Sequence, residues 1–299
     1  MAGQSAVGKG PSRTTADRPL PDRPMTRRPK ILVFDSGLGG LTVFAEVLKI
    51  RPHADFVYCA DDAGFPYGPL SNEDLVARVL FVVQRLIETE APDMAVIACN
   101  TASTLALPPL RARWPHIPFV GTVPAIKPAA QRSRSRMICV LATPGTVARD
   151  YTRSLIASFA EDCAVTLVGS GSLASLAEDF MRGAAISDAD VAREIAPCFV
   201  EGADGARTDA IVLACTHYPL LNDFFERSAP WPVEWIDPAP AIARQADRLL
   251  AEKFGADAPS GTGQPERRAI FTSGRQPEPA LEAALARYGL TTAKGDAAV

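Results

Sequence analysis

Short runs rich in Val, Ile and Leu recur along most of the chain, and longer stretches with helical spacing separate them. The runs lie at residues 31–34, 55–60, 94–99, 118–123, 137–142, 164–169, 210–215, 233–237 and 268–273. The stretch at 72–89 is typical of the intervening segments, because its apolar residues return every three or four positions. Apolar strands that alternate with helices predict an α/β fold, in which parallel sheets are covered by helices on both faces.

The same order of elements occurs twice along the chain. Residues 30–43 (KILVFDSGLGGLTV) and residues 137–150 (MICVLATPGTVARD) each combine a strand, a small polar turn and a helix start. We therefore expect two similar domains, each a mostly parallel sheet flanked by helices, with the active site in the cleft between them. We assign residues 30–122 and 240–292 to the first domain, 123–239 to the second, and 1–29 to a disordered N-terminal arm rich in Pro, Gly, Ser and Arg.

Composition and charge exclude several classes of partner. Of the 299 residues 47% are hydrophobic, and the net charge is only -3, so we expect a small-molecule ligand and no nucleic-acid partner. No apolar run reaches the roughly 18–20 residues that span a bilayer, and the N-terminus lacks the apolar core of a secretory signal, so we expect a cytoplasmic protein. The six cysteines form no C-x-x-C pair. We expect free thiols and no metal site.

Two of the predicted strands end in Ala-Cys, and small polar residues follow each cysteine. These residues are Cys99, Asn100 and Thr101 in one case, and Cys215, Thr216 and His217 in the other. Because ligands gather outside the carboxyl ends of parallel strands, both cysteines are predicted to face one cleft. From the residues alone, each is either a catalytic thiol or a small buried hydrophobe. Similarly, His217 either tunes the thiol or caps its loop.

The turn at 35–42 (DSGLGGLT) offers backbone N–H groups between a strand and a helix, where a phosphate or a carboxylate could bind. It meets the dinucleotide fingerprint only in part. Gly37 and Gly39 fit, but Thr42 occupies the third glycine position, although Asp61 stands where a ribose ligand is expected.

A different ligand suits this turn better. The carboxylate of Asp35 would repel a pyrophosphate, so we prefer a ligand that carries a cation as well as an anion, such as an amino acid. The loop at 64–71 (GFPYGPLS) supplies Tyr67 and Gly68, which could close over such a ligand.

Six segments occur in the order found in cofactor-independent glutamate racemases, which the chain resembles from about Lys30 to Ala251. They are FDSGLGGLTV, PYGPLS, ACNTAST, GTVPAIKPAA, ATPGTV and ACTHYPLL. The resemblance implies that L- and D-glutamate are interconverted without cofactor or metal, to supply D-glutamate for peptidoglycan. It makes Cys99 and Cys215 the acid/base thiols on opposite faces of the substrate Cα. In the family, the first thiol is associated with deprotonation of D-glutamate and the second with that of L-glutamate.

The resemblance also implies further site residues and partners. The implied substrate contacts are Asp35, Ser36, Tyr67, Gly68, Asn100, Thr101, Thr216 and His217. Asp35, His217 and Glu178 are expected to assist catalysis, and Glu178 would support the histidine. The segment GSGSLASLAE is typical of the proteobacterial branch. That branch tends to be activated by a nucleotide-linked peptidoglycan precursor, and family members are often homodimers, so we expect both here.

Three alternatives remain at this point. A related enzyme could act on aspartate or an arylmalonate, but the decarboxylases of the superfamily keep only one of the two cysteines. A binding protein could have kept the fold and lost the chemistry, yet both thiols and their polar followers are present. A nicotinamide-linked oxidoreductase is disfavoured by Thr42 and Asp35 in the glycine turn.

Overall fold

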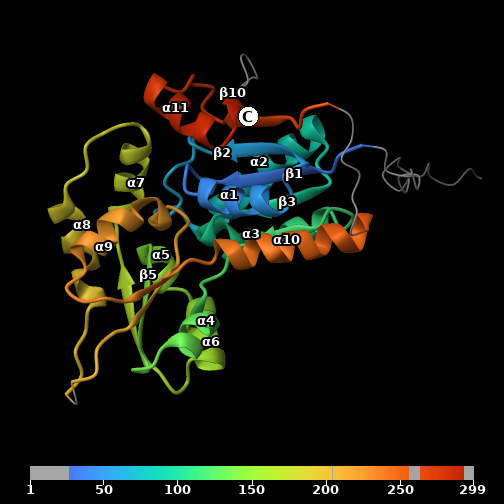
Figure 1. Ribbon diagram of the computed structural model, residues 1–299. Helices are drawn as coiled ribbons and strands as arrows, with labels where there is room; N and C mark the ends of the chain where they lie inside the picture. Colours follow the sequence, from blue (N-terminus) through green and yellow to red (C-terminus); the bar gives the residue numbers. More distant parts are fainter. Residues whose placement is uncertain (1–26, 204, 256–262, 293–299) are drawn as a thin grey trace, which may run out of the picture.

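The computed structural model describes residues 27–203, 205–255 and 263–292. These residues form two separate β-sheets, which lie in different parts of the molecule (Figure 1). All strand pairs within both sheets are parallel. The first sheet has the order β10(Thr291–Thr292), β9(Arg267–Phe271), β2(Asp55–Ala60), β1(Lys30–Asp35), β3(Met94–Ile97) and β4(Phe119–Gly121). The second has the order β6(Ala164–Gly169), β5(Met137–Ala142), β7(Ala210–Leu213) and β8(Glu234–Ile236).

Helices cover both faces of the first sheet, as its apolar strands require. On one face lie α1(Leu41–Ile50), α10(Ala239–Phe254) and α11(Pro279–Arg287). On the other lie α2(Asn72–Glu90) and α3(Asn100–Arg113). The predicted helix at 72–89 corresponds to α2, where Ser71 caps the first turn by accepting a hydrogen bond from the backbone N–H of Asp74.

The second sheet is covered in the same way. Apolar residues of α4(Ile126–Arg132) and α6(Asp150–Phe159) pack on one face. The other face is covered by α7(Leu173–Met181), α8(Asp188–Ile195), η1(Ala196–Cys198), η2(Tyr218–Leu221) and α9(Asn222–Ser228). The short helix α5(Pro144–Val147) follows β5 directly. The predicted α/β fold class with two helix-flanked sheets is therefore confirmed.

The chain leaves the first sheet after β4, builds the second sheet, and returns to the first through α10. We keep the boundaries near 122 and 240 as a proposal that agrees with this path. Residues 1–26 of the expected arm lie outside the described residues. Its last part is in contact with the fold, because the guanidinium of Arg27 donates two hydrogen bonds of 2.8 Å to the carboxylate of Asp93.

The two strands that carry the cysteines end earlier than the sequence predicted. We expected strands through Cys99 and Cys215, but β3 ends at Ile97 and β7 at Leu213. The backbone N–H of Ala98 still donates to Phe34 in β1 (2.7 Å), and after it the chain turns into α3 with Cys99 as the N-cap residue. Each cysteine thus lies on the turn beyond its strand. The two-residue strand β10 was not predicted at all.

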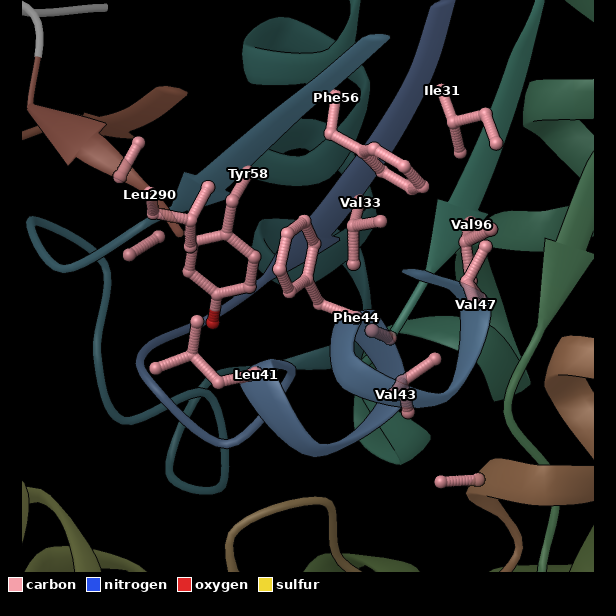
Figure 2. Packing of buried hydrophobic residues seen from close by; sticks show 14 of the residues in the cluster. Ile31, Val33, Leu41, Val43, Phe44, Val47, Phe56, Tyr58, Val96 and Leu290 are labelled. Atoms are coloured by element: carbon pink, nitrogen blue, oxygen red, sulfur yellow. The ribbon is translucent and has the colours of Figure 1, made fainter. Parts of the chain in front are cut away.

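Aromatic rings fill the core between α1 and the first sheet (Figure 2). The ring of Phe44 packs edge-on against Phe56 and Tyr58, with centroid distances of 5.2 and 6.2 Å. The buried hydroxyl of Tyr58 donates a 2.6 Å hydrogen bond to the carbonyl of Gly37. The core is therefore tied directly to the glycine turn between β1 and α1.

Replacing Phe44 with Ala is expected to lower the free energy of unfolding by about 3–5 kcal/mol, because a fully buried ring leaves a cavity. The matched control is Phe81→Ala on α2, where the ring is 51% exposed. We expect that change to cost less than about 0.5 kcal/mol. Urea unfolding of both variants measures the difference, and equal losses would contradict this account of the core.

Candidate functional site

A cavity lies between the carboxyl ends of the two sheets. Its walls come from turns that follow β1, β2, β3, β5 and β7, together with α7. The lining residues are Ser36, Phe65, Pro66, Tyr67, Gly68, Cys99, Asn100, Thr101, Thr143, Ala174, Ala214, Cys215, Thr216 and His217. Such a position, outside the carboxyl ends of the strands, is where parallel sheets bind ligands.

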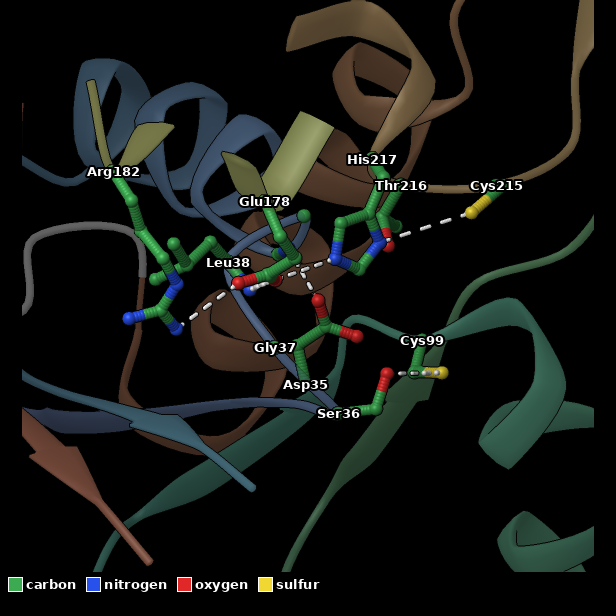
Figure 3. A network of polar contacts seen from close by, with 12 residues as sticks. Asp35, Ser36, Gly37, Leu38, Cys99, Glu178, Arg182, Cys215, Thr216 and His217 are labelled. Carbon is green, nitrogen blue, oxygen red and sulfur yellow. Dashed lines mark hydrogen bonds and ion pairs between the residues drawn. The ribbon is translucent and has the colours of Figure 1, made fainter. Parts of the chain in front are cut away.

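Cys99 faces the cavity from the first sheet and is 6% exposed. Its Sγ lies 3.6 Å from the hydroxyl of Ser36 (Figure 3). Burial and the nearby carboxylate of Asp35 raise the pKa of the Cys99 thiol, and hydrogen bonds from Ala102 and Ser36 offset only part of that rise. In the ligand-free protein Cys99 is therefore a thiol, ready to donate a proton.

Cys215 faces the same cavity from the second sheet and has different neighbours. Its Sγ lies 3.8 Å from Nδ1 of His217, while Nε2 of His217 lies 2.8 Å from Oε1 of Glu178. Figure 3 shows the three side chains in line, with Cys215 and Glu178 on opposite sides of the imidazole. The glutamate orients the histidine and the histidine faces the sulfur, so the two thiols are not equivalent.

The charges of His217 and Glu178 follow from their surroundings. Burial alone would lower the pKa of His217, but hydrogen bonds to Cys215 and Glu178 raise it well above its ordinary value. Burial alone would raise the pKa of Glu178, but hydrogen bonds from His217 and Leu38 and the charge of Arg182 bring it below its ordinary value. The pair is therefore an imidazolium and a carboxylate at neutral pH, and Nδ1–H points at the sulfur of Cys215.

Glycines let the two sheets approach each other this closely. The backbone N–H of Leu38 donates a 2.5 Å hydrogen bond to Oε1 of Glu178. Leu38 belongs to the unit built on the first sheet, and Glu178 to the unit built on the second. A Cβ on Gly37 would lie 2.2 Å from that oxygen, and a Cβ on Gly39 would lie 2.6 Å from the backbone nitrogen of His217. These two positions therefore exclude any larger residue while the units keep this contact.

Two N–H groups of the glycine turn, which the sequence offered to a ligand, are taken by the protein itself. The N–H of Leu38 binds Glu178, and that of Gly40 donates a 2.7 Å hydrogen bond to Oδ2 of Asp35. Two carboxylates of the protein itself thus occupy the anion-binding groups. Thr42, which departs from the dinucleotide fingerprint, donates from its hydroxyl to the backbone carbonyl of Thr216 (3.1 Å) and adds a second link between the units.

The structure brings most of the predicted site residues to the cavity wall. Those that line it are Ser36, Tyr67, Gly68, Cys99, Asn100, Thr101, Cys215, Thr216 and His217. Asp35 and Glu178 do not line it. Asp35 is fully buried behind the wall, where burial raises its pKa, and Glu178 contacts the cavity only through His217.

Sequence reasoning missed several wall residues. They are Phe65, Pro66, Thr143, Ala174 and Ala214. The ring of Phe65 lies 5.5 Å from that of His217, so it screens the histidine from solvent on one side. Thr143 carried a usable signal, since it follows β5 at the same rim as the two cysteines.

Two polar groups at the site lack partners among the described residues. Both amide atoms of Asn100 are buried and make no hydrogen bond, and neither does Oδ1 of Asp35. Buried polar atoms rarely remain unpaired, so a water molecule or a polar ligand is expected to pair with the amide of Asn100.

Within the ranges that the structure describes, no group of three or more His, Cys, Asp or Glu side chains is arranged to hold a metal ion. None of the helices described there is long and apolar enough to cross a membrane. The side chains that line the cavity carry two thiols, an imidazole, an amide and the hydroxyls of Ser36, Tyr67, Thr101, Thr143 and Thr216. Such a set can exchange protons with a polar ligand on two sides.

Comparison with known proteins agrees with this geometry. Residues 43–246 match the family described as Asp/Glu/Hydantoin racemase. The chain belongs to this family of racemases. It is 53% identical over 261 residues to a glutamate racemase from Agrobacterium fabrum, covering 87% of this chain and 93% of the relative. It is 50% identical over 287 residues to one from Brucella canis, covering 96% and 99%. The protein is accordingly an amino-acid racemase, an isomerase, of the glutamate racemase type.

Solved structures of glutamate racemases share the fold. A crystal structure of the Escherichia coli enzyme in complex with L-glutamate and the activator UDP-MurNAc-Ala superimposes with a TM-score of 0.80 at 38% identity, over 89% of this chain and 97% of that one. The Bacillus anthracis enzyme gives a TM-score of 0.73 at 26% identity, over 91% and 98%. The predicted relationship to proteobacterial glutamate racemases is confirmed.

The Glu178–His217 pair predicts a pH-dependent contribution to the stability of the racemase. The lowered pKa of Glu178 stabilises the folded protein at pH values above the ordinary glutamate pKa of about 4.3. The raised pKa of His217 stabilises it at pH values below the ordinary histidine pKa of about 6.5. Glu178→Gln is expected to cost about 2 kcal/mol between those pH values. The loss should shrink as the pH falls through the folded-state pKa of Glu178 or rises through that of His217.

Urea unfolding at several pH values measures this dependence, and NMR titration of the imidazoles tests its cause. The pKa of His217 should fall in Glu178→Gln, because the substitution removes the carboxylate that stabilises the imidazolium. An unchanged His217 titration would contradict the assignment of the ion pair.

Proposed function

We propose that this glutamate racemase works by a cofactor-independent two-base mechanism with Cys99 and Cys215 as the acid/base pair. The observation that carries the proposal is that both thiols line one cavity, each from the rim of a different sheet. Racemisation removes a proton from one face of Cα and delivers one to the other, so it needs two groups in opposite protonation states. The unequal surroundings of the two cysteines supply those states.

For L-glutamate, Cys215 acts as the base. His217 donates Nδ1–H toward its sulfur, which stabilises a thiolate at this position. The Cα–H bond breaks, its proton passes to Sγ of Cys215, and the electron pair stays on the substrate as a planar carbanion. The Cys99 thiol then gives its proton to the opposite face, which forms D-glutamate and leaves Cys99 as the thiolate. The reverse reaction starts from that thiolate.

The other wall residues hold the amino acid and stabilise the carbanion. The unpaired amide of Asn100 and the hydroxyls of Ser36, Thr101 and Thr216 can bind the polar groups of glutamate. Donors aimed at the α-carboxylate stabilise the negative charge that spreads onto it in the transition state. Support comes from the Escherichia coli relative, whose crystal structure contains L-glutamate.

Three of the proposed substrate residues act from behind the wall or along its edge. Asp35 lies behind the wall and does not reach the cavity surface, so its carboxylate acts on the substrate ammonium group through its charge. Tyr67 and Gly68 form the edge that closes the cavity on the side of β2. Glu178 holds the imidazolium that faces Cys215.

We further propose that the D-glutamate serves peptidoglycan synthesis in the cytoplasm. The activator in the Escherichia coli structure, UDP-MurNAc-Ala, is a muramic acid derivative and so belongs to cell-wall chemistry. Activation of this protein by the same class of nucleotide-linked precursor is part of the proposal. The homodimer implied by the family resemblance stays a prediction, which sedimentation of the purified protein would check.

Replacing either Cys99 or Cys215 with Ser should lower racemisation by about a hundredfold to ten-thousandfold, because a hydroxyl is a far weaker acid/base group at neutral pH. Circular dichroism follows the conversion of each glutamate enantiomer. The matched control is Cys163→Ser, since Cys163 lies outside the cavity wall and should leave the rate unchanged.

The kinetics provide an internal check. Because L- and D-glutamate have equal free energy, kcat/KM must be the same in the two directions. Any loss must appear equally for L- and D-glutamate. A Cys99→Ser or Cys215→Ser variant that racemises at a near-normal rate would overturn the two-base mechanism.

A further inference from the structure

Asp61 is a fully buried carboxylate that the mechanism above does not use. It follows β2 directly, and its side chain does not line the cavity. Oδ2 accepts hydrogen bonds from the hydroxyl of Tyr67 and from Nε of Arg78 (2.9 Å), and Oδ1 accepts one from the hydroxyl of Thr272 (2.6 Å). A carboxylate that the sequence offered as a ribose ligand is thus occupied by three side chains of the protein.

The three partners come from three different segments of the chain. Tyr67 lies in the loop that lines the cavity, Arg78 on α2, and Thr272 immediately after β9 near the C-terminal end of the fold. The hydroxyl of Thr272 also accepts a 3.2 Å hydrogen bond from the backbone N–H of Ala63. The carboxylate therefore joins one wall of the site to a helix and to the C-terminal strand.

The anchor of Asp61 is rigid. Its backbone N–H donates a 2.8 Å hydrogen bond to the carbonyl of Asp35, which continues the pairing of β1 with β2. The guanidinium of Arg78 balances its charge, and this pairing raises the pKa of Arg78. A carboxylate fixed to the sheet and paired with an Arg can hold a hydroxyl in one place.

The loop leaves little space around this contact. A Cβ on Gly64 would lie 2.7 Å from Oδ2 of Asp61 and 3.0 Å from Cε1 of Tyr67. Burial and the Asp61 carboxylate hold the pKa of Tyr67 far above its usual range, so its hydroxyl remains a donor at every working pH. The hydrogen bond between Tyr67 and Asp61 therefore fixes the position of the loop at 64–71.

We propose that Asp61 is a positioning residue that sets the Tyr67–Gly68 wall of the glutamate site through the Tyr67 hydroxyl, and that Arg78 and Thr272 hold it in place. The proposal rests on the proposed function only in taking this cavity as the glutamate site. Because Asp61 touches no reacting atom, it should act on substrate binding and not on proton transfer. Binding that is lost equally in the ground state and the transition state raises KM and leaves kcat unchanged.

Asp61→Asn is the direct test. Asparagine keeps the shape and an oxygen for Thr272, but its NH₂ group faces the donors of Tyr67 and Arg78. We expect KM for both enantiomers to rise roughly tenfold to a hundredfold with kcat within about twofold of wild type. The matched control is Asp62→Asn. Asp62 accepts hydrogen bonds from the backbone N–H and hydroxyl of Ser273 and a long one (3.5 Å) from the hydroxyl of Thr272, but its carboxylate accepts none of the bonds that Tyr67 and Arg78 donate to Asp61.

Tyr67→Phe shows whether the effect passes through the hydroxyl. It should raise KM as Asp61→Asn does, and the double variant should be no worse than either single variant, because both remove the same contact. Additive effects, or a Tyr67→Phe variant with wild-type KM, would overturn the proposal. So would a wild-type KM in Asp61→Asn, or an Asp62→Asn variant with the same rise.

If Asp61→Asn does not fold, as judged by circular dichroism, Thr272→Val replaces it. Valine keeps the shape of threonine but removes one hydrogen bond to Asp61 and one from Ala63, so KM should rise about threefold or more. An unchanged KM in that variant would overturn the proposal. An inactive wild-type protein would instead refute the proposed function, so the two failures are distinguishable.

Discussion

The carboxylate of Glu178 is bonded to both halves of the molecule at once, and the arrangement of the site depends on that contact. Oε1 accepts hydrogen bonds from the backbone of Leu38, which follows β1, and from His217, which follows β7. It can do so only because Gly37 and Gly39 leave room for side chains of the opposite unit. The same contact keeps the two sheet rims together and holds the imidazolium against Cys215, so closure of the cleft and the charge state of the site are physically linked.

This link explains why two similar strand ends yield two different thiols. Cys99 is buried beside Asp35, and both burial and that negative charge disfavour the thiolate. Cys215 instead faces an imidazolium whose charge is maintained by Glu178. The proposed two-base mechanism needs one base and one acid at the same time, and the unequal surroundings of the two cysteines favour that difference. If the two thiols had identical surroundings, only the bound substrate could make their protonation states differ.

The sequence predicted the parts of the site that follow from local pattern. Alternating apolar strands and helices indicate parallel sheets, and parallel sheets place residues after the strands at one rim, so Cys99 and Cys215 could be placed in one cleft. The bond from Leu38 to Glu178 could not be derived from spacing, because 140 residues separate the two. The bond from Thr272 to Asp61 was missed for the same reason, because 211 residues separate them, and the Asp61 carboxylate was considered for a ribose. Side-chain contacts between distant segments depend on how the helices pack, which periodicity does not encode.

The central claim, that two thiols act on opposite faces of one carbon, is tested most directly by isotope exchange. L-Glutamate is incubated with the protein in deuterated water, the reaction is stopped early, and deuterium at Cα is measured separately in each enantiomer. If Cys215 takes the proton and Cys99 delivers another, the D-glutamate formed carries deuterium from the outset and the remaining L-glutamate keeps its hydrogen. Product that retains the substrate hydrogen, or substrate that exchanges as fast as product forms, would show a single base and contradict the account.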